Sequence, residues 1–149
     1  MVSLYGYIDL RDGFIRRIIA VEWKVRGIRG ATTVSENTVE AIREAVQELL
    51  AEIESHNKLE TEEIISAIFT TTPDLDAVFP AKIARERPNW DNVSLLDVQQ
   101  MHVEGSLERC IRVLIHLNSL QPQKAMVHTY LRQAQNLRPD WNLAQVTKG

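Results

Sequence analysis

Apolar residues recur at helical spacing between residues 36 and 55, which is the most regular pattern in the chain. The opposite face carries glutamate and glutamine, as expected for a helix with one solvated side. Thr33 and Glu36 have the spacing of a capping box. We therefore predict an amphipathic helix over 36–55, with the apolar positions Val39, Ile42, Val46, Leu49, Leu50 and Ile53.

Four other segments are rich in residues that favour strands, namely 23–32, 64–71, 93–97 and 109–118. The first contains two glycines, which indicate close backbone approach. The second ends at the turn signal Thr72-Pro73-Asp74. We predict one strand in each segment.

Two shorter helices complete the expected elements. One covers 79–85, with Pro80 in its first turn and Asp74 or Asp76 as its cap. The other covers 123–134. Together the elements predict an α/β (α+β) fold in which a mixed β-sheet is covered by helices.

The two ends of the chain differ from this domain. Residues 1–22 hold apolar side chains without a clear cap or a settled period. Three interpretations of this extension remain open: a short appended strand or helix, a mobile segment, or a translation start placed too early, with Val21 as the true start. We assign 23–142 to the folded domain and 143–149 to a polar tail.

Length and composition restrict the class of protein. With 149 residues, 44% of them apolar and 25% charged, the chain suits one globular domain. A net charge of -3 gives no general reason to expect nucleic acid or an anionic membrane as partner. No apolar run is long enough to span a bilayer, and charged residues interrupt the first twenty positions. We expect a cytoplasmic protein.

The sequence offers little for metal or thiol chemistry. Its one cysteine, Cys110, excludes an intramolecular disulfide, and its apolar surroundings indicate a core thiol. The histidines, His56, His102, His116 and His128, include no pair at the helical spacing of metal ligands. We expect neither a metal nor a cofactor.

Three arginines carry the chemical hints. Arg29 lies in the glycine-containing strand, Arg85 ends a short helix, and Arg112 interrupts the most apolar strand. Burying an arginine is costly unless an anion meets it. Spacing alone leaves two interpretations open. One is a salt bridge or an exposed sheet face; the other is a site for a carboxylate or phosphate, whose oxygens suit the guanidinium fork.

Several separate stretches match one known family in order and spacing. They are Arg26-Gly-Ile-Arg-Gly-Ala-Thr-Thr-Val34, Thr72-Pro-Asp-Leu-Asp-Ala-Val-Phe-Pro-Ala-Lys82 with the following Arg85-Glu86, Cys110-Ile-Arg-Val113, Tyr130-Leu131 and Leu137-Arg-Pro-Asp140. Over roughly 23–142 the chain resembles the monofunctional, AroH-like chorismate mutases of the Bacillus type. Several motifs in register are more specific than a single signature.

The resemblance implies a pseudo-barrel homotrimer with an active site between neighbouring subunits. It implies the Claisen rearrangement of chorismate to prephenate in phenylalanine and tyrosine biosynthesis, without a nucleophile, a metal or proton transfer. The expected partners are then chorismate, prephenate and further copies of the chain, with no nucleic acid and no membrane.

The resemblance also implies roles for individual residues. Arg29 and Arg112 are the expected catalytic residues, and Arg112 donates to the ether oxygen that gains negative charge. Together with Tyr130 they hold one end of the substrate, while Arg85 near the rim screens the second carboxylate. The expected wall residues from the adjoining subunit are Phe79, Ala81 and Lys82.

Two positions depart from the family pattern. Gln100 stands where a glutamate usually accepts the substrate's ring hydroxyl, and its amide oxygen can still accept. Asp97 stands where a cysteine lines the same corner, and it either restores a carboxylate from the other side or faces solvent. Two other functions therefore stay open: a Rid-like enamine/imine deaminase on a similar trimer, and a catalytically weakened trimer that binds chorismate.

Overall fold

The computed structural model describes residues 22–141. The interpretations of the N-terminal extension and of the polar tail therefore concern residues that lie outside the described range, apart from Glu22. Along the chain the elements are β1 Lys24–Thr33, α1 Val39–Asn57, η1 Thr61–Glu63, β2 Ile64–Thr71, α2 Pro80–Ala84, β3 Ser94–Gln99, β4 Cys110–Ser119, η2 Gln123–Ala125, β5 Thr129–Tyr130 and η3 Arg132–Leu137, where η marks a 3₁₀ helix.

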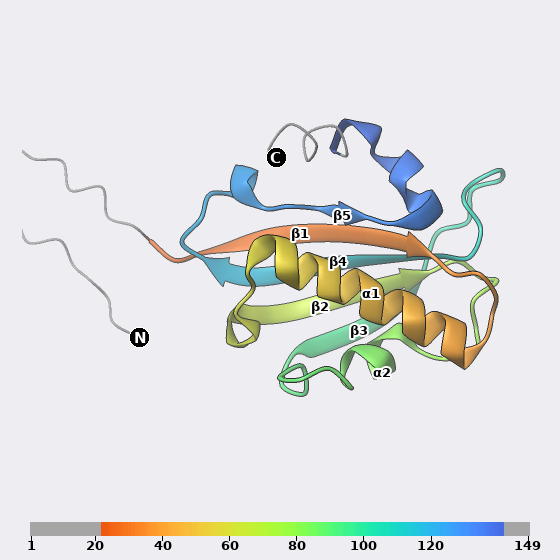
Figure 1. Cartoon of the computed structure of the whole chain (residues 1–149), viewed down its shortest axis with the longest axis horizontal. Helices are drawn as coiled ribbons and strands as arrows, with labels where there is room; N and C mark the ends of the chain where they lie inside the picture. The colour runs from red at the N-terminus through yellow and green to blue at the C-terminus, as the bar shows by residue number, and fades with distance from the viewer. Residues whose placement is uncertain (1–21, 142–149) are drawn as a thin grey trace, which may run out of the picture.

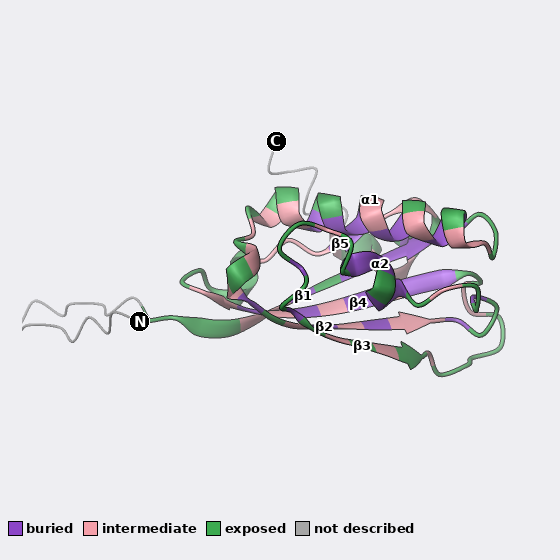
Figure 2. Ribbon diagram, turned by 90° about the horizontal axis from the view of Figure 1, so that it is seen from below, coloured by how far each residue is buried: buried purple, intermediate pink, exposed green. Residues whose placement is uncertain are grey.

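The strands form one five-stranded sheet in the order β3-β2-β4-β1-β5. The central strand β4 pairs antiparallel with both β1 and β2, whereas the edge strands β3 and β5 run parallel to their neighbours. Helices α1 and α2 both lie on one side of the sheet (Figures 1 and 2). The predicted mixed sheet covered by helices is confirmed, and both α-helices lie on the same face.

The main core lies between α1 and the covered face of the sheet. Ile53 of α1, Phe69 of β2 and Ile115 of β4 are fully buried there. Gly30 allows α1 to pack this closely on β1, because a Cβ at this position would lie 2.7 Å from Ile53 Cδ1 and 3.2 Å from the Thr129 carbonyl oxygen. Close approach at this glycine, which the sequence indicated, is therefore observed.

The helix predicted over 36–55 is present, but its start was wrong. Thr33 belongs to β1, where it pairs with Cys110, so it is not available as a cap. The N-cap is Thr38, whose side-chain oxygen accepts a hydrogen bond from Ala41 N at 3.2 Å. A threonine in extended conformation thus ends the loop and begins α1 at Val39.

The helix predicted over 123–134 is also wrong. The segment forms η2, the short strand β5 and the start of η3. Its middle lies along the free edge of β1, where Gly30 pairs with Thr129 and Ala31 with Tyr130. Backbone pairing with a distant strand overrides the local helical pattern here.

The predicted caps of the short helix α2 were wrong, although Pro80 does occupy its first position. Asp74 Oδ2 accepts from Arg109 N at 2.9 Å, and Asp76 Oδ1 accepts from Asn37 Nδ2 at 2.6 Å. Both carboxylates therefore hold loops together at a distance from the α2 N-terminus.

Neither α1 nor α2 lies on the second face of the sheet (Figure 2), which we call the uncovered face; only at its β1–β5 edge does Ala134 of η3 pack against Ala31. Side chains on this face alternate with the core residues, and they include the exposed Val25, Leu96 and Val98, with exposed fractions of 56%, 57% and 43%. Exposed apolar residues that gather on one sheet face are typical of a surface that a partner covers.

Candidate active site

The strand register places Arg29 and Arg112 on the uncovered face. Ile28 pairs with Ile115, and both point into the core, so the neighbouring positions point the other way. Arg29 lies opposite Leu114, two residues along β4 from Arg112. Such diagonal neighbours have Cβ atoms roughly 7–8 Å apart. The two arginines therefore lie side by side on one surface.

Four buried polar atoms in this part of the fold have no hydrogen-bond partner within the described chain. They are Thr70 Oγ1, Gln100 Oε1, Arg112 Nε and Tyr130 Oη. Thr70 lies opposite Arg112 in the β2–β4 register, and Tyr130 lies beside Ala31, which is the β1 partner of Arg112. Native proteins rarely leave buried polar atoms unpaired, so this group points to a ligand or a partner chain.

The electrostatics around Tyr130 are strongly cationic. Burial raises the pKa of the Tyr130 phenol, while the positive charges of Arg29, Arg138 and Arg112 lower it. Within residues 22–141, neither Arg29 nor Arg112 forms an ion pair. This surface can therefore receive an anion without displacing a carboxylate of the described chain.

Sequence reasoning missed three residues that support this cluster. His128 Nδ1 accepts the Arg29 backbone N–H at 2.9 Å, and its ring stacks on Trp141 with centroids 4.0 Å apart. The Arg138 guanidinium lies 3.4 Å from the centre of the Trp141 ring and pairs with Asp140 at 2.9 Å. The motif Leu137-Arg-Pro-Asp140 was the available signal for Arg138, whereas nothing local marked the stacking of His128 on Trp141.

The pKa of His128 is lowered, first by burial and then by the charges of Arg29 and Arg138. A neutral ring with an unprotonated Nδ1 suits its role as acceptor for the Arg29 N–H. His128 therefore fixes the backbone that carries Arg29 without adding charge to the surface.

The remaining predicted residues form a second group around α2. Phe79 caps this helix, Lys82 lies within it, and Arg85 follows it, all three exposed. The buried Ala81 donates its backbone N–H to Asp97 Oδ1 at 2.9 Å. Burial raises the pKa of the Asp97 carboxyl, against the opposing effects of the Ala81 N–H and the Arg85 charge.

The two groups lie on opposite faces of the sheet. The second group is attached to the edge strand β3, whereas the first spans β4, β1 and β5, with β2 between β3 and β4. Asp97 pairs with the fully buried Phe69, so its side chain lies on the covered face, opposite to that of Arg112. One protomer alone does not unite all the predicted residues.

Two pockets indent the surface of the described chain elsewhere. One of about 580 Å³ includes Arg109 and Arg132, and one of about 420 Å³ includes Trp23 and Met126. Neither is lined by a predicted site residue.

Within residues 22–141 no three His, Cys, Asp or Glu side chains gather as a metal site would require. None of the helices described is long and apolar enough to cross a bilayer.

Comparison with known proteins identifies close relatives. The family model for chorismate mutase type I matches residues 25–141. Chorismate mutase AroH of Bacillus subtilis (strain 168) is 41% identical over 124 residues, which are 83% of this chain and 98% of the relative. Chorismate mutase AroH of Thermus thermophilus is 48% identical over 122 residues, which are 81% of this chain and 99% of the relative.

A solved structure agrees with these sequences. Chorismate mutase from Clostridium thermocellum superposes with a TM-score of 0.71 at 47% identity, covering 74% of this chain and 97% of that one. The predicted resemblance and the mixed α+β fold are thereby confirmed, and none of these matches supports the deaminase alternative. The chain belongs to the chorismate mutase type I family.

Proposed function

We propose that this chorismate mutase works as a homotrimer in which each active site joins the Arg29–Arg112–Tyr130 surface of one protomer to the α2 segment of its neighbour. The observation that carries the proposal is the group of buried polar atoms without partners, above all Arg112 Nε and Tyr130 Oη. A dianionic substrate bound against them would supply the missing acceptors.

The separation of the two residue groups supports a shared site. A second protomer docked on the uncovered sheet face can bring its own α2 edge to the Arg29–Arg112 surface. The apolar side chains exposed on this face, such as Val25 and Leu96, would be removed from water in the same assembly. A closed threefold ring uses one such head-to-tail contact three times.

The reaction needs positioning and charge rather than covalent catalysis. Chorismate becomes prephenate when one carbon–oxygen bond breaks and one carbon–carbon bond forms within the same molecule. The enzyme therefore holds the dianion in its reactive ring-like conformation and places fixed positive charge where the ether oxygen becomes negative. We assign the first task to Arg29, Tyr130 and Arg85, and the second to Arg112.

The wall and the hydroxyl contact complete the proposed site. Phe79, Ala81 and Lys82 would close it from the neighbouring protomer, and Gln100 would accept the substrate's ring hydroxyl. Gln100 Oε1 suits that role because it is buried and has no partner within the described chain. The product feeds phenylalanine and tyrosine biosynthesis, and we place the enzyme in the cytoplasm.

Replacing Gln100 by glutamate is expected to change kcat/KM modestly, within about tenfold, because the acceptor oxygen is kept and a charge is added. Initial rates of chorismate consumption measure the effect. Gln99→Glu, at an exposed neighbouring position, is the matched control. Complete loss of activity in Gln100→Glu would contradict the assigned position of this side chain.

The activity is tested by following the absorbance of chorismate with purified protein and identifying prephenate among the products. Consumption of chorismate rules out a catalytically weakened trimer, whereas binding without turnover would favour it. Light scattering gives the number of protomers, and a monomer or dimer at working concentration would contradict the proposed assembly.

A mixing experiment tests the shared site itself. Arg112→Ala and Arg85→Ala, each of which we expect to be weakly active alone, place their defects on the two different halves of the proposed site. Coexpression should restore activity, because about one site in four of randomly assembled trimers then combines two intact halves. A site built within one protomer would show no recovery.

A further inference from the structure

Helix α2 is too short to hold its own position. It spans Pro80–Ala84, and a helix of this length is unstable without tertiary contacts. Its N-cap residue, Phe79, provides no side-chain acceptor, and Pro80 has no N–H. The first backbone donor inside the helix is therefore Ala81 N, which needs an acceptor from elsewhere.

Asp97 supplies that acceptor from β3. Its Oδ1 lies 2.9 Å from Ala81 N, and no other side chain in the described part of the sequence accepts from the α2 N-terminus. Asp97 is half-buried beneath the helix, on the same face of the sheet as Phe69. A carboxylate at this end of a helix also interacts favourably with the backbone dipoles.

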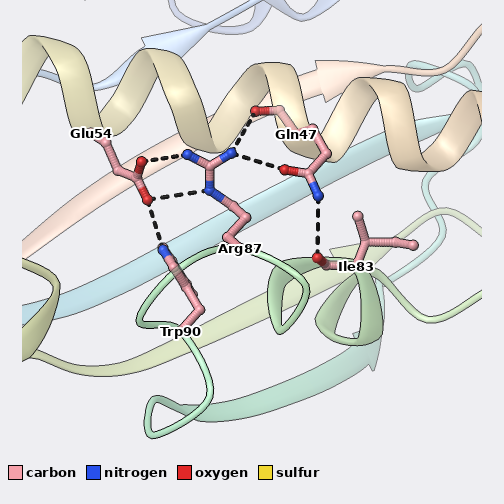
Figure 3. Close-up of polar contacts among 5 residues, drawn as sticks. All are labelled: Gln47, Glu54, Ile83, Arg87 and Trp90. Atoms are coloured by element: carbon pink, nitrogen blue, oxygen red, sulfur yellow. Dashed lines mark hydrogen bonds and ion pairs between the residues drawn. The ribbon is translucent and has the colours of Figure 1, made fainter.

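The opposite end of α2 is held from a different direction. Gln47 Nε2 of α1 donates to the Ile83 carbonyl oxygen at 3.5 Å (Figure 3). Just beyond the helix, Arg87 binds both Glu54 and Gln47 of α1, and Trp90 donates to Glu54 Oε1 at 2.7 Å. Helix α1 therefore anchors the C-terminal end of α2, and β3 anchors the N-terminal end through Asp97.

The anchored segment presents its exposed side outward. Phe79 is 69% exposed, and Lys82 and Arg85 are also exposed. The Asp97 carboxylate holds the start of this segment, because it accepts a hydrogen bond from Ala81 N. The three outward side chains are those that the proposed function assigns to the neighbouring protomer's cleft.

We propose that Asp97 is a positioning residue, which fixes the α2 wall by accepting the Ala81 N–H and does not contact the substrate. This inference rests on the proposed function, because it gives the α2 segment its importance. Asp97 does not replace the carboxylate that the family pattern places at the ring hydroxyl, since its Oδ1 is already engaged beneath the helix. Its contribution reaches the substrate through Phe79 and Lys82.

The test compares Asp97→Ala with Asp97→Asn. Loss of the acceptor in Asp97→Ala should raise KM for chorismate about tenfold and leave kcat within about twofold. The reason is that a displaced wall weakens the binding of the substrate and of the transition state equally. Asp97→Asn keeps an oxygen that accepts from Ala81 N, so its KM should remain close to that of the unmodified enzyme. Ser94→Ala, exposed on the same strand, is the control.

The other outcomes are distinguishable. An equal rise of KM in Asp97→Asn and Asp97→Ala would show that Asp97 acts through its charge, and would overturn the positioning role. Unchanged KM in Asp97→Ala, with only a lower melting temperature, would make the contact purely structural and would also overturn it. Failure of the unmodified protein to consume chorismate would reject the proposed function instead.

Discussion

Replacing Arg112 by alanine is expected to lower kcat about a hundredfold to a thousandfold, the usual loss when one preorganised donor to a developing oxyanion is removed. The melting temperature should change little. Arg112 Nε is buried without a partner, and the side chain forms no ion pair within residues 22–141, so its removal breaks few contacts of the folded chain. Chorismate absorbance gives kcat, and calorimetry gives the melting temperature.

Two variants separate charge from geometry. Arg112→Lys keeps a positive charge but loses the planar fork, so its kcat should lie well below that of the unmodified enzyme. Arg26→Ala removes an arginine of β1 whose Nε donates to the Gln121 carbonyl oxygen, and it should leave kcat nearly unchanged. Near-normal turnover in Arg112→Ala would contradict the role assigned to Arg112.

Elements with strong local patterns were predictable from the sequence. The strands at 64–71 and 109–118 and the body of the helix at 36–55 are found within a few residues of their expected bounds. Their apolar residues match the period of the element and the face it buries. For these segments local preference and tertiary packing agree.

The errors arose where a distant segment decides the local structure. The 123–134 segment is not helical, because the open edge of β1 pairs with Thr129 and Tyr130. Thr33 continues β1 instead of capping α1, because Cys110 pairs with it. A cap contributed by Asp97, sixteen residues after Ala81, leaves no pattern within the helix it caps.

The site was predictable only in part, because its residues come from distant segments of the chain. Spacing alone did not decide whether Arg112 meets a glutamate or a ligand, and the resemblance of several motifs supplied the ligand interpretation. The fold then added two facts that no motif contains: Arg29 and Arg112 share one face, and α2 lies on the other face of the sheet (Figure 2). Those facts turn a set of family positions into a geometric argument for a shared site.

Replacing Glu54 by alanine is expected to cause the largest loss of stability among single replacements of ion-paired residues in the described chain. Glu54 accepts from Arg87 through both oxygens and from Trp90 Nε1 at 2.7 Å (Figure 3). The Arg87 and Glu54 side chains are only 15% and 24% exposed. Truncation leaves the indole N–H of Trp90 without its acceptor and leaves the Arg87 guanidinium with Gln47 but without a carboxylate, in a mostly buried place.

The expected cost is about 2–3 kcal/mol, between the values for exposed and fully buried ion pairs. For a domain of this size that corresponds to a fall of about 6–9 °C in the melting temperature. The matched control is Glu86→Ala. Glu86 pairs at 3.1 Å with Arg43, which lies on α1, the helix that also carries Glu54. With exposed fractions of 40% and 42%, that pair is screened by solvent, and its loss should lower the melting temperature much less.

The contrast between the two glutamates tests whether burial decides the value of these ion pairs. Calorimetry of both variants at one protein concentration keeps any contribution from assembly constant. Equal losses in Glu54→Ala and Glu86→Ala would contradict the prediction. Arg87 and Trp90 follow α2 in the chain and connect its C-terminal end to Glu54 of α1. A rise of KM for chorismate in Glu54→Ala would therefore show that the C-terminal end of α2 has shifted.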